Sequence, residues 1–237
     1  MSVTATSNPA GMSLVLPLYN EADGIREIVE GLVAALVAAS VPHQLVLVNN
    51  GSTDGSASIL EALASRHPSI HIVTVPVNQG YGWGILCGLR EATAPIVGFM
   101  CADGQIAPAD VVRVYERMAR GDCDVAKVVR VTREDGTQRR VMSAVYNLLF
   151  RLLFSMRARD INGTPKLMSR EWCDRLALTS RDWFIDAELM IGLARGGARV
   201  AEVPVAFTAR VHGNSNVRLT TSLEFLRNML VHWVRRP

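Results

Sequence analysis

A single aspartate after an apolar run is the residue of this chain best placed for chemistry. Residues 95–100 (Pro-Ile-Val-Gly-Phe-Met) have the composition of a buried strand, and the segment Cys101-Ala102-Asp103-Gly104-Gln105 follows them. Open α/β sheets bind their ligands beyond the carboxyl ends of their strands. A carboxylate held there could ligate a divalent cation, which could carry a nucleotide diphosphate. The alternative is that Asp103 and Gly104 are ordinary turn residues.

Three more polar clusters follow apolar runs in the same way. They are Tyr19-Asn20-Glu21, the segment from Asn49 to Gly55 and the segment from Asn78 to Gly84. One such cluster is typical of a capped turn that enters a helix. Four of them at the carboxyl ends of successive strands would meet on one rim of a parallel sheet, and this favours a binding site.

Familiar nucleotide and hydrolase motifs are missing from the sequence. Gly80, Gly82 and Gly84 are spaced by two residues and follow the third predicted strand, so they do not form the G-x-G-x-x-G of a dinucleotide fold. The chain has no G-K-[ST] and no H-E-x-x-H, and no local signature assembles a Ser-His-Asp triad. These classes of site are therefore excluded.

The spacing of apolar residues predicts alternating strands and helices in the first half. Strands are expected at 13–18, 44–48, 70–75 and 95–100, and helices at 22–39, 56–66 and 84–92. This alternation is typical of βαβ units with right-handed crossovers and a parallel sheet. The elements expected later are helices at 109–120, 141–157, 170–176, 186–194 and 220–235, strands at 124–131, 165–169 and 199–208, and a polar loop at 132–138.

Length and composition favour one globular domain. The chain has 237 residues, 49% of them hydrophobic and 20% charged, and no linker rich in Pro, Gly or Ser. We expect a disordered tail at 1–11 and one domain at 12–237, with a nucleotide-binding half (12–105) and an acceptor-binding half (106–237). No apolar run reaches the length of a transmembrane helix. The four cysteines form no C-x-x-C pair, so we expect reduced thiols in a cytosolic protein.

The net charge of +3 hides an asymmetry between the halves. Residues 1–105 carry eight acidic and three basic side chains, and residues 106–237 carry 14 acidic and 22 basic ones. Lys127 and Lys166 are the only lysines, and every other basic residue is arginine, which suits phosphate recognition. The basic half would face an anionic substrate or membrane surface. The alternative cause is genomic base composition.

The four rim clusters resemble those of family 2 glycosyltransferases of the GT-A fold. The resemblance covers about residues 12–216 and is closest to the polyprenyl-phosphate (dolichyl-phosphate mannose synthase-like) branch. It implies an α/β fold with a single Rossmann-like domain and a mostly parallel sheet flanked by helices. The nucleotide-sugar site that it implies consists of Pro17, Tyr19, Glu21, Asn49, Asn50, Asp54, Asn78, Gly82, Ala102 and Asp103, with Asn49 or Asn50 at the base.

The second half carries signals of the same branch. Arg139, Ser143 and Asn147 recur every four residues, on one face of a helix. Asp160 precedes Asn162-Gly163-Thr164, and Phe184-x-Asp186-x-Glu188 resembles a family pattern. The resemblance implies that the catalytic residues are Asp103, Arg139 and Asp160, that Asp103 and Gln105 hold Mg²⁺ or Mn²⁺, and that an acceptor phosphate is bound by Arg130, Arg139, Ser143, Arg210 and Ser215.

The chain departs from the family at three places. Cys101 replaces the first aspartate of a D-x-D-x-Q signature, which should weaken the binding of a hard cation. Asn49 and Asn50 remove charge from the base pocket. Asn216 stands where the family usually has lysine.

These features predict an inverting transfer of a hexose from a nucleotide sugar (GDP-mannose or UDP-glucose type) to a polyprenyl phosphate. A phosphate acceptor is already an anion, so it needs no general base. We expect a peripheral contact with the cytoplasmic face of the inner membrane. The apolar segments 146–154 and 223–233 could make this contact, and the alternative is that they belong to the buried core. We expect no nucleic-acid partner. The alternatives are transfer to a soluble hydroxyl, with Asp160 or Asp186 as base, and a catalytically dead homologue that binds a nucleotide sugar.

Overall fold

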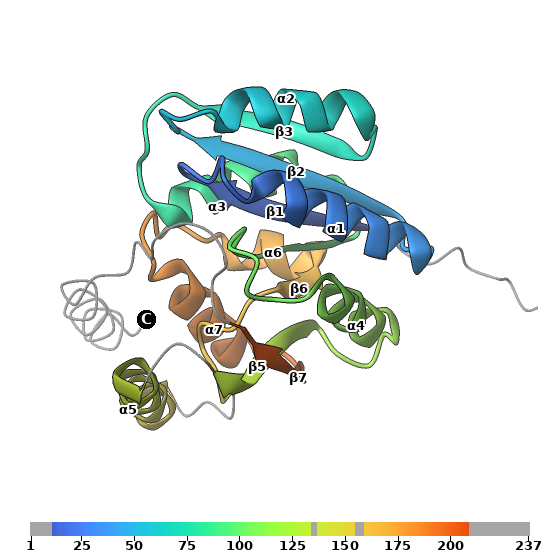
Figure 1. The fold of residues 1–237 in the computed structure, drawn as a ribbon. Helices are drawn as coiled ribbons and strands as arrows, with labels where there is room; N and C mark the ends of the chain where they lie inside the picture. The colour runs from blue at the N-terminus through green and yellow to red at the C-terminus, as the bar shows by residue number, and fades with distance from the viewer. Residues whose placement is uncertain (1–10, 134–136, 155–158, 209–237) are drawn as a thin grey trace, which may run out of the picture.

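The protein is an α/β domain built around one sheet (Figure 1). The computed structural model describes residues 11–133, 137–154 and 159–208, with the backbone alone at 132–133 and 137–143. The strands are β1 Met12–Leu18, β2 His43–Asn50, β3 Ile70–Val75, β4 Ile96–Phe99, β5 Val125–Arg133, β6 Lys166–Ser169 and β7 Val200–Phe207. The helices are α1 Ile25–Ala38, α2 Ser56–Arg66, α3 Tyr81–Glu91, α4 Pro108–Ala119, α5 Thr137–Phe154, α6 Arg170–Leu176 and α7 Ile185–Arg195.

The strand order in the described chain is β3-β2-β1-β4-β6-β5-β7. The first four strands in this order are parallel, as the alternation of strands and helices predicts. β6 is antiparallel to both β4 and β5, while β5 and β7 are parallel to each other. Every strand except β6 therefore ends at the same edge of the sheet, and the four polar clusters lie along that edge.

Helices cover both faces of the sheet, so its strands are buried on both sides (Figure 1). One core packs α1, α2 and α4 against residues such as Leu14, Leu16 and Leu47. The other packs α3, α5 and α7 against the alternate residues, including Val15 and Val48. This alternation along β1 and β2 explains why these strands are nearly continuous apolar runs in the sequence.

The expected elements in the described ranges are present within four residues of their predicted bounds, with the largest shifts at the starts of α1, α3 and α5. α3 begins at Tyr81 rather than Gly84, because the glycines of its first turn pack against another backbone segment. β5 continues to Arg133 through part of the expected polar loop, because it pairs with β7 there. Residues 1–10 of the expected tail lie outside the described residues, and so does the helix expected at 220–235. No helix in the described ranges has the length and hydropathy needed to cross a bilayer.

Candidate active site

The loops after β1 and β2 are joined into one corner by side-chain hydrogen bonds. The Asn20 Oδ1 accepts from the Thr53 amide at 2.8 Å, and the Ser56 Oγ accepts from the Glu21 amide at 3.1 Å. The two Asp54 carboxylate oxygens accept from the amides of Ala22 and Ser56, at 3.1 and 3.0 Å. Burial acts to raise the pKa of Asp54, but these hydrogen bonds outweigh it and lower the pKa. Asp54 thus supports the corner through its charge.

Asn49 and Asn50 are buried at the end of β2, with 6% and 3% of their surface exposed. The Asn49 Oδ1 accepts from the Ser52 amide at 3.0 Å, so it shapes the loop. The Asn50 Nδ2 donates to the Gly80 carbonyl at 2.9 Å. Its Oδ1 is buried without a hydrogen-bond partner among the described residues. Leaving such an acceptor unsatisfied costs about 1–3 kcal/mol.

The glycine-rich turn before α3 packs against the segment 180–183. A Cβ on Gly82 would lie 2.3 Å from the Ser180 carbonyl oxygen, and the Trp83 amide donates to the Arg181 carbonyl at 2.9 Å. The Tyr81 ring stacks on Trp183, with 4.3 Å between the ring centroids. Gly82 therefore allows close approach of two backbones, and its predicted contact with the nucleotide sugar stays a prediction.

Cys101 is a protonated thiol directed toward α3. Its Sγ lies 3.4 Å from the Tyr81 hydroxyl. Burial and the neighbouring Asp103 carboxylate raise the pKa of Cys101 to about 12. A thiol is also a poor ligand for a hard cation such as Mg²⁺, which prefers oxygen.

The Asp103 loop is tied to the end of β7. The Asp103 Oδ1 accepts from the Gln105 amide at 3.2 Å. The Gln105 Nε2 donates to the Thr208 carbonyl at 2.9 Å, and the Thr208 amide and hydroxyl both donate to the Gln105 carbonyl at 3.2 Å. The segment that carries Arg210 and Ser215 follows directly after this junction, outside the described residues.

The donor set suits a cation that a substrate helps to bind. The described residues contain no cluster of three or more His, Cys, Asp or Glu side chains able to hold a metal. Mg²⁺ is commonly bound by one or two carboxylates together with substrate phosphates and water. Asp103, with the Gln105 side-chain oxygen, fits that role but would hold an ion weakly without a diphosphate.

Arg130 and Asp160 form a buried ion pair beside the carboxyl end of β5. The Arg130 Nε and one terminal nitrogen donate to the two Asp160 oxygens, both at 2.7 Å, and the Arg130 amide donates at 3.2 Å. Their side chains are 12% and 7% exposed, so this is no surface ion pair. Burial acts to raise the pKa of Asp160, but the hydrogen bonds and charge of Arg130 lower it well below its usual range.

The other candidate base, Asp186, is buried at the start of α7 and paired with Lys166. Burial raises its pKa, against the charge of Lys166. Glu188 has a structural contact, since its carboxylate accepts from the Thr179 and Ser180 amides at 3.0 and 2.8 Å.

The rest of the predicted acceptor site is placed in part. Arg139 and Ser143 lie one turn apart on α5, but their side chains are not described. Asn147, on the same helix, accepts at its Oδ1 from the Ile161 amide at 3.0 Å and so fixes α5 to the turn that follows Asp160. Sequence reasoning missed the partners of this region, Lys127 and Glu202, although the rarity of lysine was a signal.

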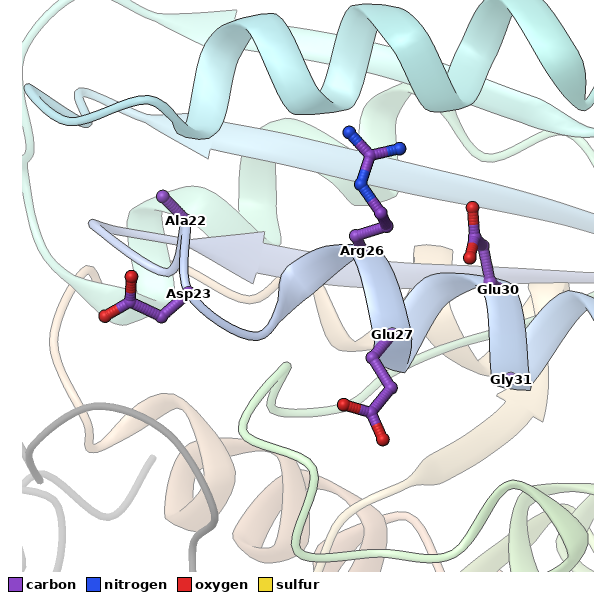
Figure 2. Close-up of a pocket in the computed structure, with 6 residues that line it drawn as sticks. All are labelled: Ala22, Asp23, Arg26, Glu27, Glu30 and Gly31. Carbon is purple, nitrogen blue, oxygen red and sulfur yellow. The ribbon is translucent and has the colours of Figure 1, made fainter.

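A separate hollow of about 510 Å³ lies along the start of α1 (Figure 2). It is lined by Ala22, Asp23, Arg26, Glu27, Glu30 and Gly31. In Figure 2, Arg26 and Glu30 project toward α2, and Glu27 projects to the opposite side. Its three carboxylates outnumber the guanidinium of Arg26 and that of Arg66, which pairs with Glu30 at 2.8 Å, so the hollow does not suit a diphosphate.

The fold and the rim define a glycosyltransferase of the GT-A class. The chain is similar in structure to glucosyl-3-phosphoglycerate synthase from Mycobacterium tuberculosis, with a TM-score of 0.76. That enzyme was crystallised in complex with Mn²⁺, UDP and phosphoglyceric acid. That similarity covers 96% of this chain and 80% of that one at 22% sequence identity, and it shows the shared fold. The sequence model of the family described as glycosyl transferase family 2 matches residues 13–177. The chain therefore belongs to this family.

Curated relatives agree with the branch that the motifs indicate. The chain is 31% identical to an undecaprenyl-phosphate 4-deoxy-4-formamido-L-arabinose transferase of Pseudomonas aeruginosa (strain LESB58), over 95% of its own length and 66% of that protein's. The transferase of the same name from Sodalis glossinidius is 30% identical, with 95% and 68% covered. The chain thus spans about two thirds of the length of these relatives.

Proposed function

We propose that this chain transfers a sugar, a hexose by our sequence prediction, from a nucleotide sugar to a polyprenyl phosphate, with inversion. The observation that carries this proposal is the state of the two candidate bases. Asp160 is ion-paired with Arg130 and has a lowered pKa, and Asp186 is buried against Lys166. A hydroxyl acceptor needs a base that can reach it, whereas a phosphate acceptor needs none. The names of the relatives support the same acceptor.

The residues divide into two groups in this proposal. Pro17, Tyr19, Glu21, Asn49 and Asn50 belong to the nucleotide site in this proposal. Asp103 and Gln105 face the diphosphate, where Mg²⁺ or Mn²⁺, when bound, would neutralise charge on the departing group. Arg130 binds the acceptor phosphate together with the predicted Arg139, Ser143, Arg210 and Ser215.

The reaction follows from holding the two substrates in line. An oxygen of the acceptor phosphate attacks the anomeric carbon as the bond from that carbon to the nucleotide diphosphate breaks, so the configuration inverts. The guanidinium groups orient the acceptor. No proton has to be removed, because the attacking oxygen is already ionised. We place residues 12–105 with the donor and 106–237 with the acceptor.

Metal binding is expected to require the nucleotide. Mg²⁺ or Mn²⁺ alone should leave the melting temperature unchanged, while UDP or GDP with the metal should raise it. Ligand at 100 times its Kd stabilises the folded state by about 2.7 kcal/mol. A thermal-shift and hydrolysis screen of nucleotide sugars, with and without metal, measures this. A shift with metal alone would contradict the single-carboxylate site, and binding without any turnover toward either phosphate or hydroxyl acceptors would favour the dead homologue.

The outer face of α5 is suited to the lipid. Val145, Leu148 and Leu152 lie on one side of the helix with 53%, 49% and 70% of their surface exposed, next to the exposed Arg151. An apolar helix face beside arginine is typical of contact with an anionic membrane surface. The four cysteines are free, which agrees with a place on the cytoplasmic side.

Charges on this face should weaken membrane association. We expect the variant with Leu148→Glu and Leu152→Glu to float with anionic liposomes at low salt several-fold less than the wild type. Val37→Glu is the matched control, because Val37 is 62% exposed on α1. If both variants lose liposome binding equally, or if neither loses it, the outer face of α5 is not the membrane contact. The basic segment predicted at 220–235 lies outside the described residues.

A further inference from the structure

Thr208, at the end of β7, is joined to Gln105 of the Asp103 loop by three hydrogen bonds. The Gln105 Nε2 donates to the Thr208 carbonyl at 2.9 Å, and the Thr208 amide and hydroxyl both donate to the Gln105 carbonyl at 3.2 Å. The two residues are 103 positions apart in the sequence, so a strand from the second half of the chain holds a loop of the first half. Neither the sequence pattern nor the family resemblance assigns Thr208 a role.

These contacts decide which end of the Gln105 side-chain amide is left for another ligand. Such an amide has a nitrogen that only donates and an oxygen that only accepts. The Thr208 carbonyl can only accept, so it selects the nitrogen. If the amide turned over, two acceptors would face each other. The oxygen is therefore the end of the amide that remains available.

A fixed oxygen matters here because the loop has few groups that can bind a cation. Asp103 is the only carboxylate in residues 101–105, and its Oδ1 accepts from the backbone amide of Gln105 at 3.2 Å, so both side chains belong to one turn. Hard cations such as Mg²⁺ bind oxygen ligands. An amide that turned over would direct its N–H groups at the cation and repel it.

We propose that Thr208 is a positioning residue of the donor site: it holds the Gln105 amide so that the oxygen, and not the nitrogen, is offered to the cation on the nucleotide diphosphate. This inference rests on the proposed function, in which Asp103 and Gln105 face that diphosphate. Thr208 does not touch the cation and acts through Gln105 alone. Removing a residue that orients a metal ligand typically weakens metal binding by about 10–100-fold.

Nucleotide binding with and without Mn²⁺ tests the proposal in the full chain. UDP and GDP are both titrated by calorimetry. For the nucleotide that binds more tightly, the measured quantity is the metal ratio, defined as the Kd without Mn²⁺ divided by the Kd with it. This ratio reports on the cation site, whereas a general loss of nucleotide binding would change both Kd values together.

Thr208→Pro should lower the metal ratio about 10-fold and leave the Kd without metal unchanged. Proline has neither an N–H nor a hydroxyl, so this variant loses both donors that keep the residue 208 carbonyl at Gln105. Thr208→Ser is the matched control, because it keeps both donors and should keep the wild-type ratio.

Gln105→Glu separates the orientation of the amide from a general effect on the loop. A carboxylate offers an oxygen whichever way it turns, so it does not need a residue that orients it. In the Gln105→Glu background, Thr208→Pro should therefore leave the metal ratio nearly unchanged. An equal loss in both backgrounds would show that Thr208 only supports the loop, and it would overturn the positioning role.

Two further results would overturn the inference and leave transfer to a polyprenyl phosphate standing. They are a wild-type metal ratio in Thr208→Pro, and a wild type whose nucleotide affinity does not depend on the metal. If Thr208→Pro does not fold, Thr208→Val, which loses only the hydroxyl, takes its place. Its metal ratio should fall several-fold, and an unchanged ratio overturns the inference equally. A wild type that binds neither UDP nor GDP would overturn the proposed function itself.

Discussion

Replacing Asp103 with alanine should reduce sugar transfer by about 10²–10³-fold, the usual effect of removing one group that stabilises charge on a departing oxygen. Asp103 is the only carboxylate in residues 101–105, because Cys101 stands at the first aspartate of the D-x-D-x-Q signature that this segment resembles. Initial rates at saturating Mg²⁺, together with the metal-dependent thermal shift, measure the effect. The nucleotide should still bind without metal.

Cys101→Asp is the matched control for this prediction. It restores the second carboxylate and should tighten metal binding or leave it unchanged. An Asp103→Ala variant that keeps full activity in the presence of a chelator would show that the reaction does not depend on this carboxylate or on a metal held by it.

Replacing Asp160 with alanine should have the largest effect on stability and should also abolish acceptor use. The change leaves the buried guanidinium of Arg130 without its carboxylate, and breaking a buried pair in this way costs about 3–5 kcal/mol. Denaturant unfolding measures the loss. Because the folded pKa of Asp160 is lowered, its stabilising contribution is present above the unfolded pKa and is lost only as the pH falls through the folded value. The wild type should therefore keep this contribution at mildly acidic pH.

A double-mutant cycle separates the pair from its surroundings. Asp160→Asn with Arg130→Met removes both charges, and it should recover part of the stability that Asp160→Asn alone loses. Additive losses would mean that the two side chains do not stabilise each other. The Asp160→Asn variant should not use a polyprenyl phosphate, because Arg130 has lost the carboxylate that orients it. The double variant should not use it either, because Arg130 is absent.

The parts of the fold that sequence predicted are those governed by local pattern. The runs that became β1 to β4 are continuous and apolar because helices cover them on both faces, and their polar ends marked the rim. The resemblance implied the GT-A fold and the mostly parallel sheet, which the structure confirms. The antiparallel β6 and the extension of β5 depend on pairing between distant strands, which periodicity does not record.

The site was predictable where one segment carries the chemistry and not where segments meet. Asp103 could be found from its place after a strand. Gly82 was assigned to the nucleotide site through the family resemblance, which does not show that its closest neighbours come from residues 180–182, about a hundred positions later. The pairing of Arg130 with Asp160 and of Lys127 with Glu202 joins separate loops and strands in the same way. Only the folded chain brings these charges together.

The most direct test of the central claim compares a polyprenyl phosphate with the corresponding polyprenol as acceptors for the same nucleotide sugar. Mass spectrometry of the lipid products measures which oxygen receives the sugar. We predict that the phosphate is glycosylated and that the neutral alcohol is not, because Arg130 offers a cation to an anion and, among the described residues, the two candidate bases Asp160 and Asp186 are both buried in ion pairs. Glycosylation of the alcohol or of a soluble hydroxyl, with the phosphate inert, would contradict the account and make Asp186 the base to examine.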